Sequence, residues 1–301
     1  MKRKYILLVV GFLVALNIFC WKEVFALAGN NYLKVNFLDV GQGDSIFIET
    51  PEGHQIIIDG GPNSVLLQKL AERMPFWDKT IDLVILTHPE KDHMTGLLDV
   101  LQRYKVDYFL WTGVIKDDAE NKRLASLLDK AQNPPKNFFL AALNHASATK
   151  VLIASAGQEI KAGNVLVDTL YPFENMAGEE MKNTSNDSCI VSKIIYGKNS
   201  FLFTGDISSV AEKQLANSYE LANLKSDVLK VAHHGSKYSS SDLFLSTVKP
   251  GIAVIEVGKN SYGHPTPETL QRLADVGAEV LRTDQNGDIT IISDGEKVSL
   301  R

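Results

Sequence analysis

Apolar and polar stretches alternate along the chain and predict strands and helices in turn. Short apolar runs bounded by glycine-containing turns are typical of strands, and apolar residues three and four positions apart are typical of amphipathic helices. The expected strands are 32–38, 45–49, 55–58, 81–86, 106–110, 165–171, 189–196, 200–203, 228–232, 252–257, 279–282 and 289–292, and the expected helices are 65–74, 94–104, 118–131, 208–219, 239–248 and 267–276. Strands interleaved with helices predict a layered α/β domain.

The stretch 81–98 organises this pattern. Residues 81–86 form a continuous apolar run, which suits a strand buried on both faces. Four potential metal ligands follow within seven residues: His88, Glu90, Asp92 and His93. Helical spacing then begins near Met94, so these side chains lie between a strand's carboxyl end and a helix's amino end, where open α/β sheets bind ligands. A solvated charged loop is the alternative interpretation of this segment alone.

Three later strand ends carry the same kind of side chain. Asp206 follows the apolar strand 200–203, His233 and His234 follow 228–232, and His264 follows 252–257. A single such residue usually caps an element or makes a hydrogen bond. Several of them, each after a separate buried strand, favour a shared metal ion, because buried imidazoles and carboxylates need partners.

Residues 1–28 differ from the rest of the chain. Three basic residues at 2–4 precede an apolar run over 5–19, and 26–28 reads Ala-Leu-Ala, a small-x-small cleavage pattern. This order is typical of a secretory signal peptide. The run is short for a membrane span, but an uncleaved anchor with its basic end inside is the alternative. We therefore expect the main domain, 29–301, to work outside the cytoplasmic membrane, and the chain to touch the membrane only through 1–28, if that segment is not cleaved. The polar segment 112–150 reads as a variable insertion within that domain.

Charge and cysteine content argue against a protein that binds polyanions by charge alone and against a domain stabilised by internal disulfides. Beyond residue 28 the chain has 27 basic and 35 acidic residues, a net charge of −8. A protein that binds polyanions by charge alone would be basic. Only Cys189 lies beyond residue 28, so no internal disulfide is expected there, and Cys189 reads as a small core residue.

Several strings of residues carry a family resemblance. They are Phe37-Leu-Asp-Val-Gly-Gln-Gly-Asp44, Thr87-His-Pro-Glu-Lys-Asp-His93, Leu229-Lys-Val-Ala-His-His-Gly-Ser236, Tyr262-Gly-His-Pro265 and Arg282-Thr-Asp-Gln-Asn-Gly287. With the order Asp-Gly-Gly, His-x-x-x-Asp-His, Thr-Gly-Asp and His, the chain resembles the metallo-β-lactamase fold superfamily. More narrowly, residues 33 to 293 are similar to the hydrolase domain of ComEC-type DNA-uptake proteins. We expect the hydrolase module without their multi-span channel region.

The resemblance implies an αββα sandwich with a metal site at one edge, between two sheets. It assigns metal ligands to His88, Asp92, His93 and Asp206, with Asp206 bridging if two ions bind. It favours His233 over His234 as the last imidazole ligand and places His264 near the reacting phosphate. The superfamily's second histidine is Glu90 here, and its mid-chain histidine is replaced within Asn186-Asp187-Ser188.

These replacements shape the expected metal content. Carboxylate and amide oxygens in place of imidazole move the preference from zinc towards manganese or magnesium. We expect one strongly held divalent ion, Zn²⁺ or Mn²⁺, at Asp92, His93, Asp206 and His233. A weaker second ion would use Glu90 as a ligand.

The expected function is metal-dependent phosphodiester hydrolysis outside the cytoplasm, with DNA or another phosphodiester as substrate. Asp92 or Asp206 would orient the attacking water, and His264 or His234 would stabilise charge or protonate the leaving oxygen. Hydrolysis of a cell-wall phosphoester or another small ester is the second hypothesis. A metal-binding module without catalytic activity is the third.

Overall fold

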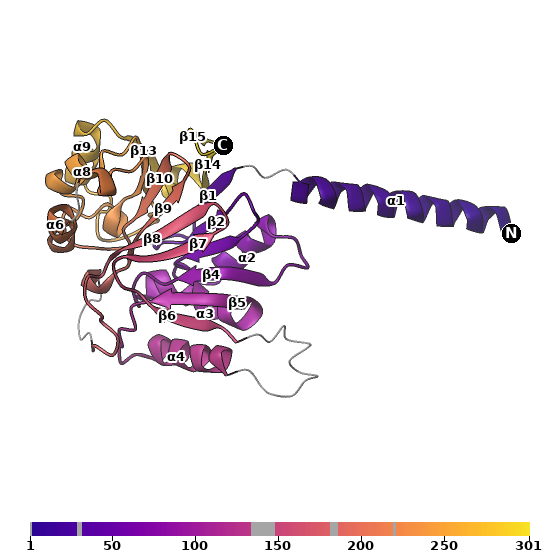
Figure 1. Cartoon of the computed structure of the whole chain (residues 1–301), viewed down its shortest axis with the longest axis horizontal. Helices are drawn as coiled ribbons and strands as arrows, with labels where there is room; N and C mark the ends of the chain where they lie inside the picture. Colours follow the sequence, from indigo (N-terminus) through magenta and orange to yellow (C-terminus); the bar gives the residue numbers. More distant parts are fainter. Residues whose placement is uncertain (1, 29–31, 134–147, 181–185, 219–220) are drawn as a thin grey trace.

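The computed structural model describes residues 2–28, 32–133, 148–180, 186–218 and 221–301. Helix α1 (Lys2–Ala28) projects away from a body that contains all other described elements (Figure 1). Within α1, Arg3–Trp21 is long and apolar enough to cross a membrane, and none of it is buried. A signal sequence and a membrane anchor share these properties.

The first of two sheets contains eight strands in the order β15-β14-β1-β2-β3-β4-β5-β6. They are β1 (Leu33–Phe37), β2 (Ile46–Glu49), β3 (Gln55–Ile58), β4 (Thr80–Ile85), β5 (Lys105–Trp111), β6 (Lys150–Ile153), β14 (Ile289–Ser293) and β15 (Val298–Leu300). Strands β15 to β3 pair antiparallel, and β3 to β6 pair parallel. The parallel part needs crossover connections, and the helices between its strands supply them.

The second sheet contains seven strands in the order β13-β12-β11-β10-β9-β8-β7. They are β7 (Gln158–Ala162), β8 (Val165–Tyr171), β9 (Val191–Tyr196), β10 (Asn199–Phe203), β11 (Val228–Lys230), β12 (Ile252–Ile255) and β13 (Glu279–Arg282). Strands β7 to β10 pair antiparallel, and β10 to β13 pair parallel. Each sheet thus has a parallel half, and the loops that follow the carboxyl ends of its parallel strands lie together at one edge of that sheet.

Helices cover the outer faces of both sheets. The first sheet carries α2 (Val65–Arg73), α3 (Lys91–Arg103) and α4 (Ala119–Gln132), and the second carries α6 (Ser209–Ser218), α7 (Leu221–Leu224), α8 (Asp242–Val248) and α9 (Pro267–Asp275). The facing sides of the sheets bury a third apolar layer, in which Phe37 and Phe203 lie 6.2 Å apart between ring centroids. This four-layer αββα arrangement confirms the expected fold class (Figure 1). The described residues form three further short elements: η1 (Asn186–Ser188), η2 (Ala232–Gly235) and α10 (Thr283–Asn286).

The expected strands and helices are present, most of them with ends shifted by a few residues. Helix α3 begins at Lys91, three residues before the expected start, because its polar first turn lies outside the apolar repeat. The carboxylate of Asp92 in that turn is favourable beside the helix amino terminus. Helix α8 begins at Asp242, later than expected, because the backbone N–H groups of Ser240 and Ser241 donate to the Glu212 carboxylate instead.

The sequence pattern did not predict β6, β7 and β15. All three lie at sheet edges, where side chains are less buried and the apolar signal is weak. Within the segment expected as an insertion, α4 is present and packs on the outer face of the first sheet through Leu124 and Leu128. The breaker Pro134-Pro135 and His145 lie outside the described residues.

Candidate metal centre

The candidate site lies at the edge where loops from both sheets meet. The strands that precede these loops are held by buried apolar side chains on both faces, so the start of each loop is fixed. The loops and the adjoining helix start carry Asp44 between β1 and β2, Asp59 after β3, His88 after β4, Asp92 and His93 in α3, Asp206 after β10, His233 and His234 in η2, and His264 after β12.

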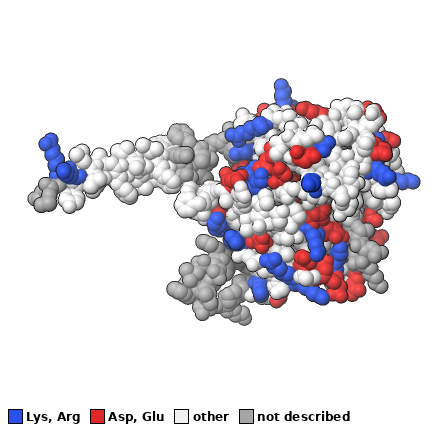
Figure 2. All heavy atoms as spheres, turned by 180° about the vertical axis from the view of Figure 1, so that it is seen from behind, with Lys and Arg blue, Asp and Glu red and all other residues white. Residues whose placement is uncertain are grey.

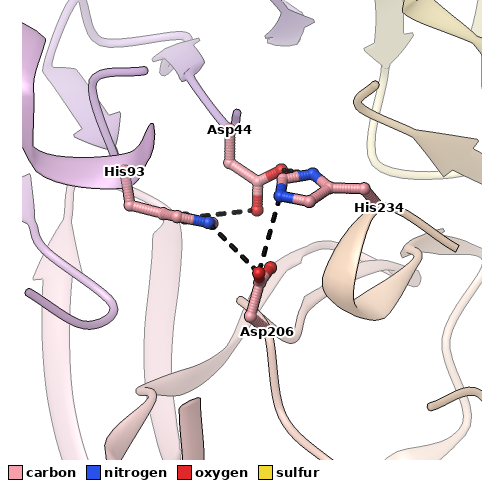
Figure 3. Close-up of side chains that lie close together, drawn as sticks. All are labelled: Asp44, His93, Asp206 and His234. Carbon is pink, nitrogen blue, oxygen red and sulfur yellow. Dashed lines mark ion pairs between the residues drawn. The ribbon is translucent and has the colours of Figure 1, made fainter. Parts of the chain in front are cut away.

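Four of these side chains form a buried cluster: Asp44, His93, Asp206 and His234 (Figure 3). Each is at most 3% exposed, and one ligand atom from each lies within 4.8 Å of the other three. Two carboxylates and two imidazoles from four separate segments of the chain therefore face one small volume. This composition suits a divalent cation such as Zn²⁺ or Mn²⁺.

The separations between the ligand atoms fit a metal ion better than direct hydrogen bonds. The Nε2 atom of His93 is 3.4 Å from Oδ2 of Asp206, and Nε2 of His234 is 3.5 Å from the same oxygen. Oδ2 of Asp92 also approaches, 3.4 Å from His234 Nε2. Metal–ligand bonds of about 2.1 Å place neighbouring ligands roughly 3 to 3.5 Å apart. Both Nε2 atoms are buried and make no hydrogen bond to a described residue, so a cation would satisfy them together.

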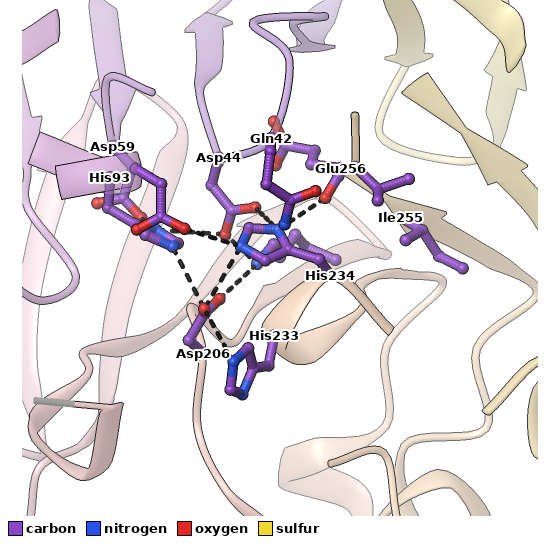
Figure 4. Close-up of polar contacts among 12 residues, drawn as sticks. Gln42, Asp44, Asp59, His93, Asp206, His233, His234, Ile255 and Glu256 are labelled. Atoms are coloured by element: carbon purple, nitrogen blue, oxygen red, sulfur yellow. Dashed lines mark hydrogen bonds and ion pairs between the residues drawn. The ribbon is translucent and has the colours of Figure 1, made fainter. Parts of the chain in front are cut away.

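The other nitrogen of each imidazole is held by a second protein group (Figure 4). The Nδ1 atom of His93 lies 2.8 Å from Oδ2 of Asp59, and Nδ1 of His234 lies 2.8 Å from the carbonyl oxygen of Glu256. A carbonyl oxygen only accepts, so His234 donates from Nδ1, and a carboxylate partner favours the same tautomer for His93. Metal-binding histidines have such outer partners, which direct the Nε2 lone pair to the ion.

Backbone constraints hold these partners in place. The residue Asp59 adopts φ 58, and its carboxylate also accepts from the backbone N–H and hydroxyl of Thr87 at 2.8 and 2.6 Å. The glycine before Asp44 is required by a close approach, because a Cβ on Gly43 would lie 2.2 Å from the carbonyl oxygen of Asp92. That approach allows the Asp44 N–H to donate to the same oxygen at 3.2 Å. The first loop and the start of α3 are thereby fixed to each other.

A buried cation, Lys230, lies behind the two carboxylates of the cluster. It is the last residue of β11, 1% exposed, and its ammonium pairs with Oδ2 of Asp44. The same ammonium donates to the carbonyl oxygen of Gly205 at 2.9 Å and lies 3.6 Å from Oδ1 of Asp206. Burial lowers the pKa of Lys230, but the charges of Asp44 and Asp206 outweigh it and raise the pKa, so the ammonium stays charged. Part of the negative charge at the site is therefore balanced within the protein.

The carboxylates set the protonation of the two cluster imidazoles. Burial lowers the pKa of His234, but Asp206 and Asp44 outweigh it and raise the pKa to about 10. Burial also opposes the charged form of His93, yet Asp206 and Asp44 hold its pKa well above the ordinary value. At neutral pH both imidazoles of the ion-free site are therefore protonated on both ring nitrogens. A metal ion must displace the Nε2 proton of each.

We expect metal affinity to rise steeply with pH for this reason. An ion binds the neutral imidazole, so each bound ion should release about two protons at pH 7, and affinity should rise by at least about tenfold per pH unit between pH 6 and 9. Calorimetric titration with Mn²⁺ in buffers of different ionisation enthalpy measures this release. A pH-independent affinity without proton release would contradict the assignment of His93 and His234 as ligands.

The structure separates the paired histidines His233 and His234, which both adopt positive φ, at 52 and 53. This conformation is uncommon for non-glycine residues and concentrates at functional sites. It directs His234 into the cluster and leaves the His233 side chain 34% exposed at the rim, with Nε2 3.9 Å from Asp206 Oδ2. Sequence analysis favoured His233 as the ligand, whereas the geometry favours His234.

The remaining predicted ligands, His88 and Glu90, differ in their surroundings. The side chain of His88 is buried, its ring centroid lies 4.2 Å from that of His93, and its Nε2 has no hydrogen-bond partner among the described residues. Burial and the nearby His93 lower the pKa of His88 to about 3, so it is neutral and able to bind a cation. The structure does not bring Glu90 into the cluster, because its carboxylate pairs with Lys116 at 2.7 Å.

The predicted catalytic residues Asp92 and His264 lie at different distances from the buried cluster. The carboxylate of Asp92 contacts the cluster at its solvent side, 37% exposed. His264 lies at the rim, with its ring centroid 5.6 Å from that of His233, and its buried Nδ1 has no hydrogen-bond partner among the described residues. At the position of the missing mid-chain histidine, the side-chain amide of Asn186 lies 3.3 Å from Nδ1 of His233.

Sequence analysis assigned no role to four groups that build the site: Asp44, Asp59, Lys230 and Glu256. Asp44 and Lys230 stood in the quoted strings without a role, and Asp59 is the aspartate of the Asp-Gly-Gly motif. A stronger signal was available for Lys230, because a charged residue ended an otherwise apolar, fully buried strand. The carboxyl of Glu256 accepts from the backbone N–H of Ser45 at 2.9 Å and links the two sheets.

Comparison with known proteins gives a consistent result. Residues 54–229 match the model of the beta-lactamase superfamily domain. The chain is 33% identical over 280 residues to ComE operon protein 3 of Bacillus subtilis, an alignment that covers 85% of this chain and 32% of that protein. It is 27% identical over 264 residues to Recombination protein 2 of Haemophilus influenzae, covering 86% of this chain and 28% of that protein. The chain therefore spans about a third of the length of these curated relatives.

A solved structure supports the fold. The metallo-β-lactamase fold protein YhfI of Bacillus subtilis superposes with a TM-score of 0.53, covering 87% of this chain and 99% of that chain, at 14% sequence identity. At this identity the likeness concerns the fold alone. The chemistry of the site is argued from the side chains of this chain.

Proposed function

Because the chain belongs to the beta-lactamase superfamily and resembles the ComEC-type proteins, we propose that it is an exported, metal-dependent hydrolase of phosphodiesters, with DNA as the favoured substrate. The observation that carries this proposal is the pair of buried Nε2 atoms, on His93 and His234, that converge with Asp206 and Asp92 at metal-ligand separations. When bound, a divalent ion would polarise the phosphoryl oxygen and lower the pKa of an attacking water.

The protein groups around that ion divide into two sets. His93, His234 and Asp206 of the buried cluster, with Asp92 at its solvent side, would hold it. The fourth cluster residue, Asp44, pairs with Lys230, and Asp59 and Glu256 would keep the two imidazoles oriented. Burial raises the pKa of Asp92, but the charges of His93 and His234 outweigh it and keep the pKa below the ordinary value. The exposed edge of Asp92 is therefore an anionic acceptor that can orient a water molecule at the opening of the site.

Two histidines at the rim of the metal site, His233 and His264, would assist departure of the leaving oxygen. Burial lowers the pKa of His264 and of His233, so both imidazoles are neutral at pH 7 and each carries one N–H donor. The neutral imidazole of His264 would donate an N–H hydrogen bond to a leaving oxygen and stabilise its charge, and its buried Nδ1 has no partner among the described residues. In this proposal the rim histidines His233 and His264 take the role that sequence analysis gave to His234 and His264.

The favoured substrate rests on the resemblance to DNA-uptake proteins together with the nature of the site. Basic and acidic side chains are interspersed over the face seen in Figure 2, in keeping with the acidic composition. Attraction for a polyanion would therefore come from the metal ion and the rim rather than from overall charge. Export is proposed because α1 has the length and composition of a signal sequence or anchor.

Activity should depend on the ion and on Asp206. We expect purified full chain with Mn²⁺ to cleave linear DNA and bis-p-nitrophenyl phosphate, and a chelator to abolish both activities. Asp206→Asn should reduce the rate by at least about 100-fold, because the ion loses one of its charged ligands. Asp294→Asn, in the turn between β14 and β15, is the matched control and should retain full activity. Hydrolysis of choline phosphoesters but not of DNA would show that DNA is not the substrate and that a small phosphoester is. A metal-loaded protein that hydrolyses none of these compounds would refute the proposal.

A further inference from the structure

Two aromatic side chains protrude from the loop 75–79, which joins α2 to β4. Phe76 is 77% exposed and Trp77 is 47% exposed, and their rings pack edge to face with centroids 4.8 Å apart. The acidic residue of this loop, Asp78, is turned inward, where its carboxylate accepts from Gln55 Nε2 at 2.8 Å and from the Thr80 N–H at 3.0 Å. The loop thus presents aromatic rings to its surroundings while its acidic group is engaged with the protein.

The loop lies against the apolar helix α1. The ring centroid of Trp77 is 6.1 Å from that of Phe19, in an edge-to-face arrangement. Phe19 stands two residues before the end of the segment Arg3–Trp21 that could cross a membrane. The surface of the segment Arg3–Trp21 is largely apolar, with basic residues at its free end (Figure 2). If the basic end faces the cytoplasm, Phe19 and Trp21 lie at the interface between the membrane and water on the extracytoplasmic side.

We propose that Phe76 and Trp77 form a second membrane contact, inserted in the outer interface of the bilayer beside α1. The proposal rests on α1 remaining as the anchor of the exported chain. Tryptophan and other aromatic residues are enriched at this depth, where an apolar ring and a polar edge are both accommodated. The exposed Lys79, whose ammonium lies 5.1 Å from the Tyr104 ring, adds a basic group beside the aromatic pair, which is favourable next to anionic lipid headgroups.

This contact would orient the metal centre. Strand β4 begins at Thr80, directly after the loop, and ends at Ile85, three residues before His88. Its six residues span about 20 Å. The loop and the metal centre therefore lie at opposite ends of one strand, and Figure 1 shows β4 and β5 running away from the side of the body that meets α1. A body held by α1 and by the loop 75–79 would point its metal centre away from the membrane, towards substrates in the extracytoplasmic space.

Single-tryptophan variants of the full chain test this inference. The sequence has three tryptophans, Trp21, Trp77 and Trp111, so pairs of Trp→Phe substitutions leave one emitter each. The variants are reconstituted in vesicles of phosphatidylcholine and phosphatidylglycerol that contain phosphatidylcholine brominated at a shallow acyl position. We expect quenching of Trp77 and of Trp21, and no quenching of Trp111, which lies at the end of β5 nearest the metal centre.

Each other outcome has a definite meaning. Quenched Trp21 with unquenched Trp77 would overturn the inference, since α1 would be inserted without the loop. Unquenched Trp21 would overturn its premise, the insertion of α1. Trp77 emission that changes with protein density in the membrane but not with bromination would indicate contact with a second copy and would also overturn it. Hydrolysis of DNA by the same vesicles reports on the proposed function independently of these results.

Discussion

Replacing His234 with asparagine should abolish tight metal binding, while replacing His233 with asparagine should leave it nearly unchanged. Removal of an outer partner of a metal ligand already costs roughly 10- to 100-fold in affinity, so loss of a direct ligand should cost about 100-fold or more. His234 Nε2 lies within 3.5 Å of both Asp206 and Asp92, whereas His233 Nε2 is 3.9 Å from Asp206 and its side chain is one-third exposed. Calorimetric titration with Mn²⁺ and Zn²⁺ compares the two variants.

The paired substitutions control for each other, because the two histidines are adjacent and share the same backbone conformation. His233→Asn should instead lower the turnover of a phosphodiester at saturating metal, in keeping with its place at the rim. Glu90→Gln provides a further control and should leave the metal affinity unaltered, because the structure pairs Glu90 with Lys116 outside the cluster. Loss of metal in His233→Asn with retention in His234→Asn would restore the ligand that sequence analysis favoured.

The fold was largely predictable because buried strands leave a clear signal in the sequence. Strands β3, β8 and β13 have the expected bounds, and most others differ by one or two residues. The αββα arrangement itself came from the family resemblance, since apolar periodicity indicates layers but does not say which strands pair. The strands that were missed are exposed edge strands, in which an apolar pattern is not required for packing.

The candidate site was predictable in part. The loops after β4, β10 and β11 were identified because His88, Asp92, His93, Asp206 and the two adjacent histidines are conspicuous after apolar strands. The choice between His233 and His234 depended on a left-handed backbone turn, which no local pattern of residue types indicates. The pairing of Glu90 with Lys116, 26 residues later, also depended on tertiary structure.

The groups behind the ligands were the hardest to foresee. Asp59 and Glu256 act through partners 34 and 22 residues away, His93 and His234, and their own surroundings are apolar strand ends. Burial raises the pKa of the Glu256 carboxyl well above its ordinary value, and Asp44 adds to that shift, so this group is neutral and adds no further anion to the site. Such a role follows from burial and from neighbouring charge, which are properties of the folded chain.

Lys230→Met should destabilise the ion-free protein by about 3 to 5 kcal/mol, because it removes the buried ammonium that pairs with Asp44 and lies beside Asp206. The same substitution should increase the affinity for Mn²⁺, since the ion then meets two carboxylates whose charge is no longer balanced. Urea unfolding of chelator-treated protein measures the first effect, and calorimetric titration the second. Lys198→Met is the control, because the Lys198 pair with Glu296 is exposed to solvent and should contribute little.

The two effects of Lys230→Met together distinguish two roles for this lysine. If Lys230 balances charge, stability without the ion falls while affinity for the ion rises, so saturating Mn²⁺ should restore much of the lost stability. If Lys230 instead serves to position Asp44 and Asp206, its loss should lower both stability and affinity, and added ion should restore little. The first result is expected, because the ammonium contacts the Asp44 carboxylate directly but lies 3.6 Å from Oδ1 of Asp206, leaving the Oδ2 atom directed at His93 and His234. A parallel fall in stability and in affinity would refute charge balance as the role of Lys230.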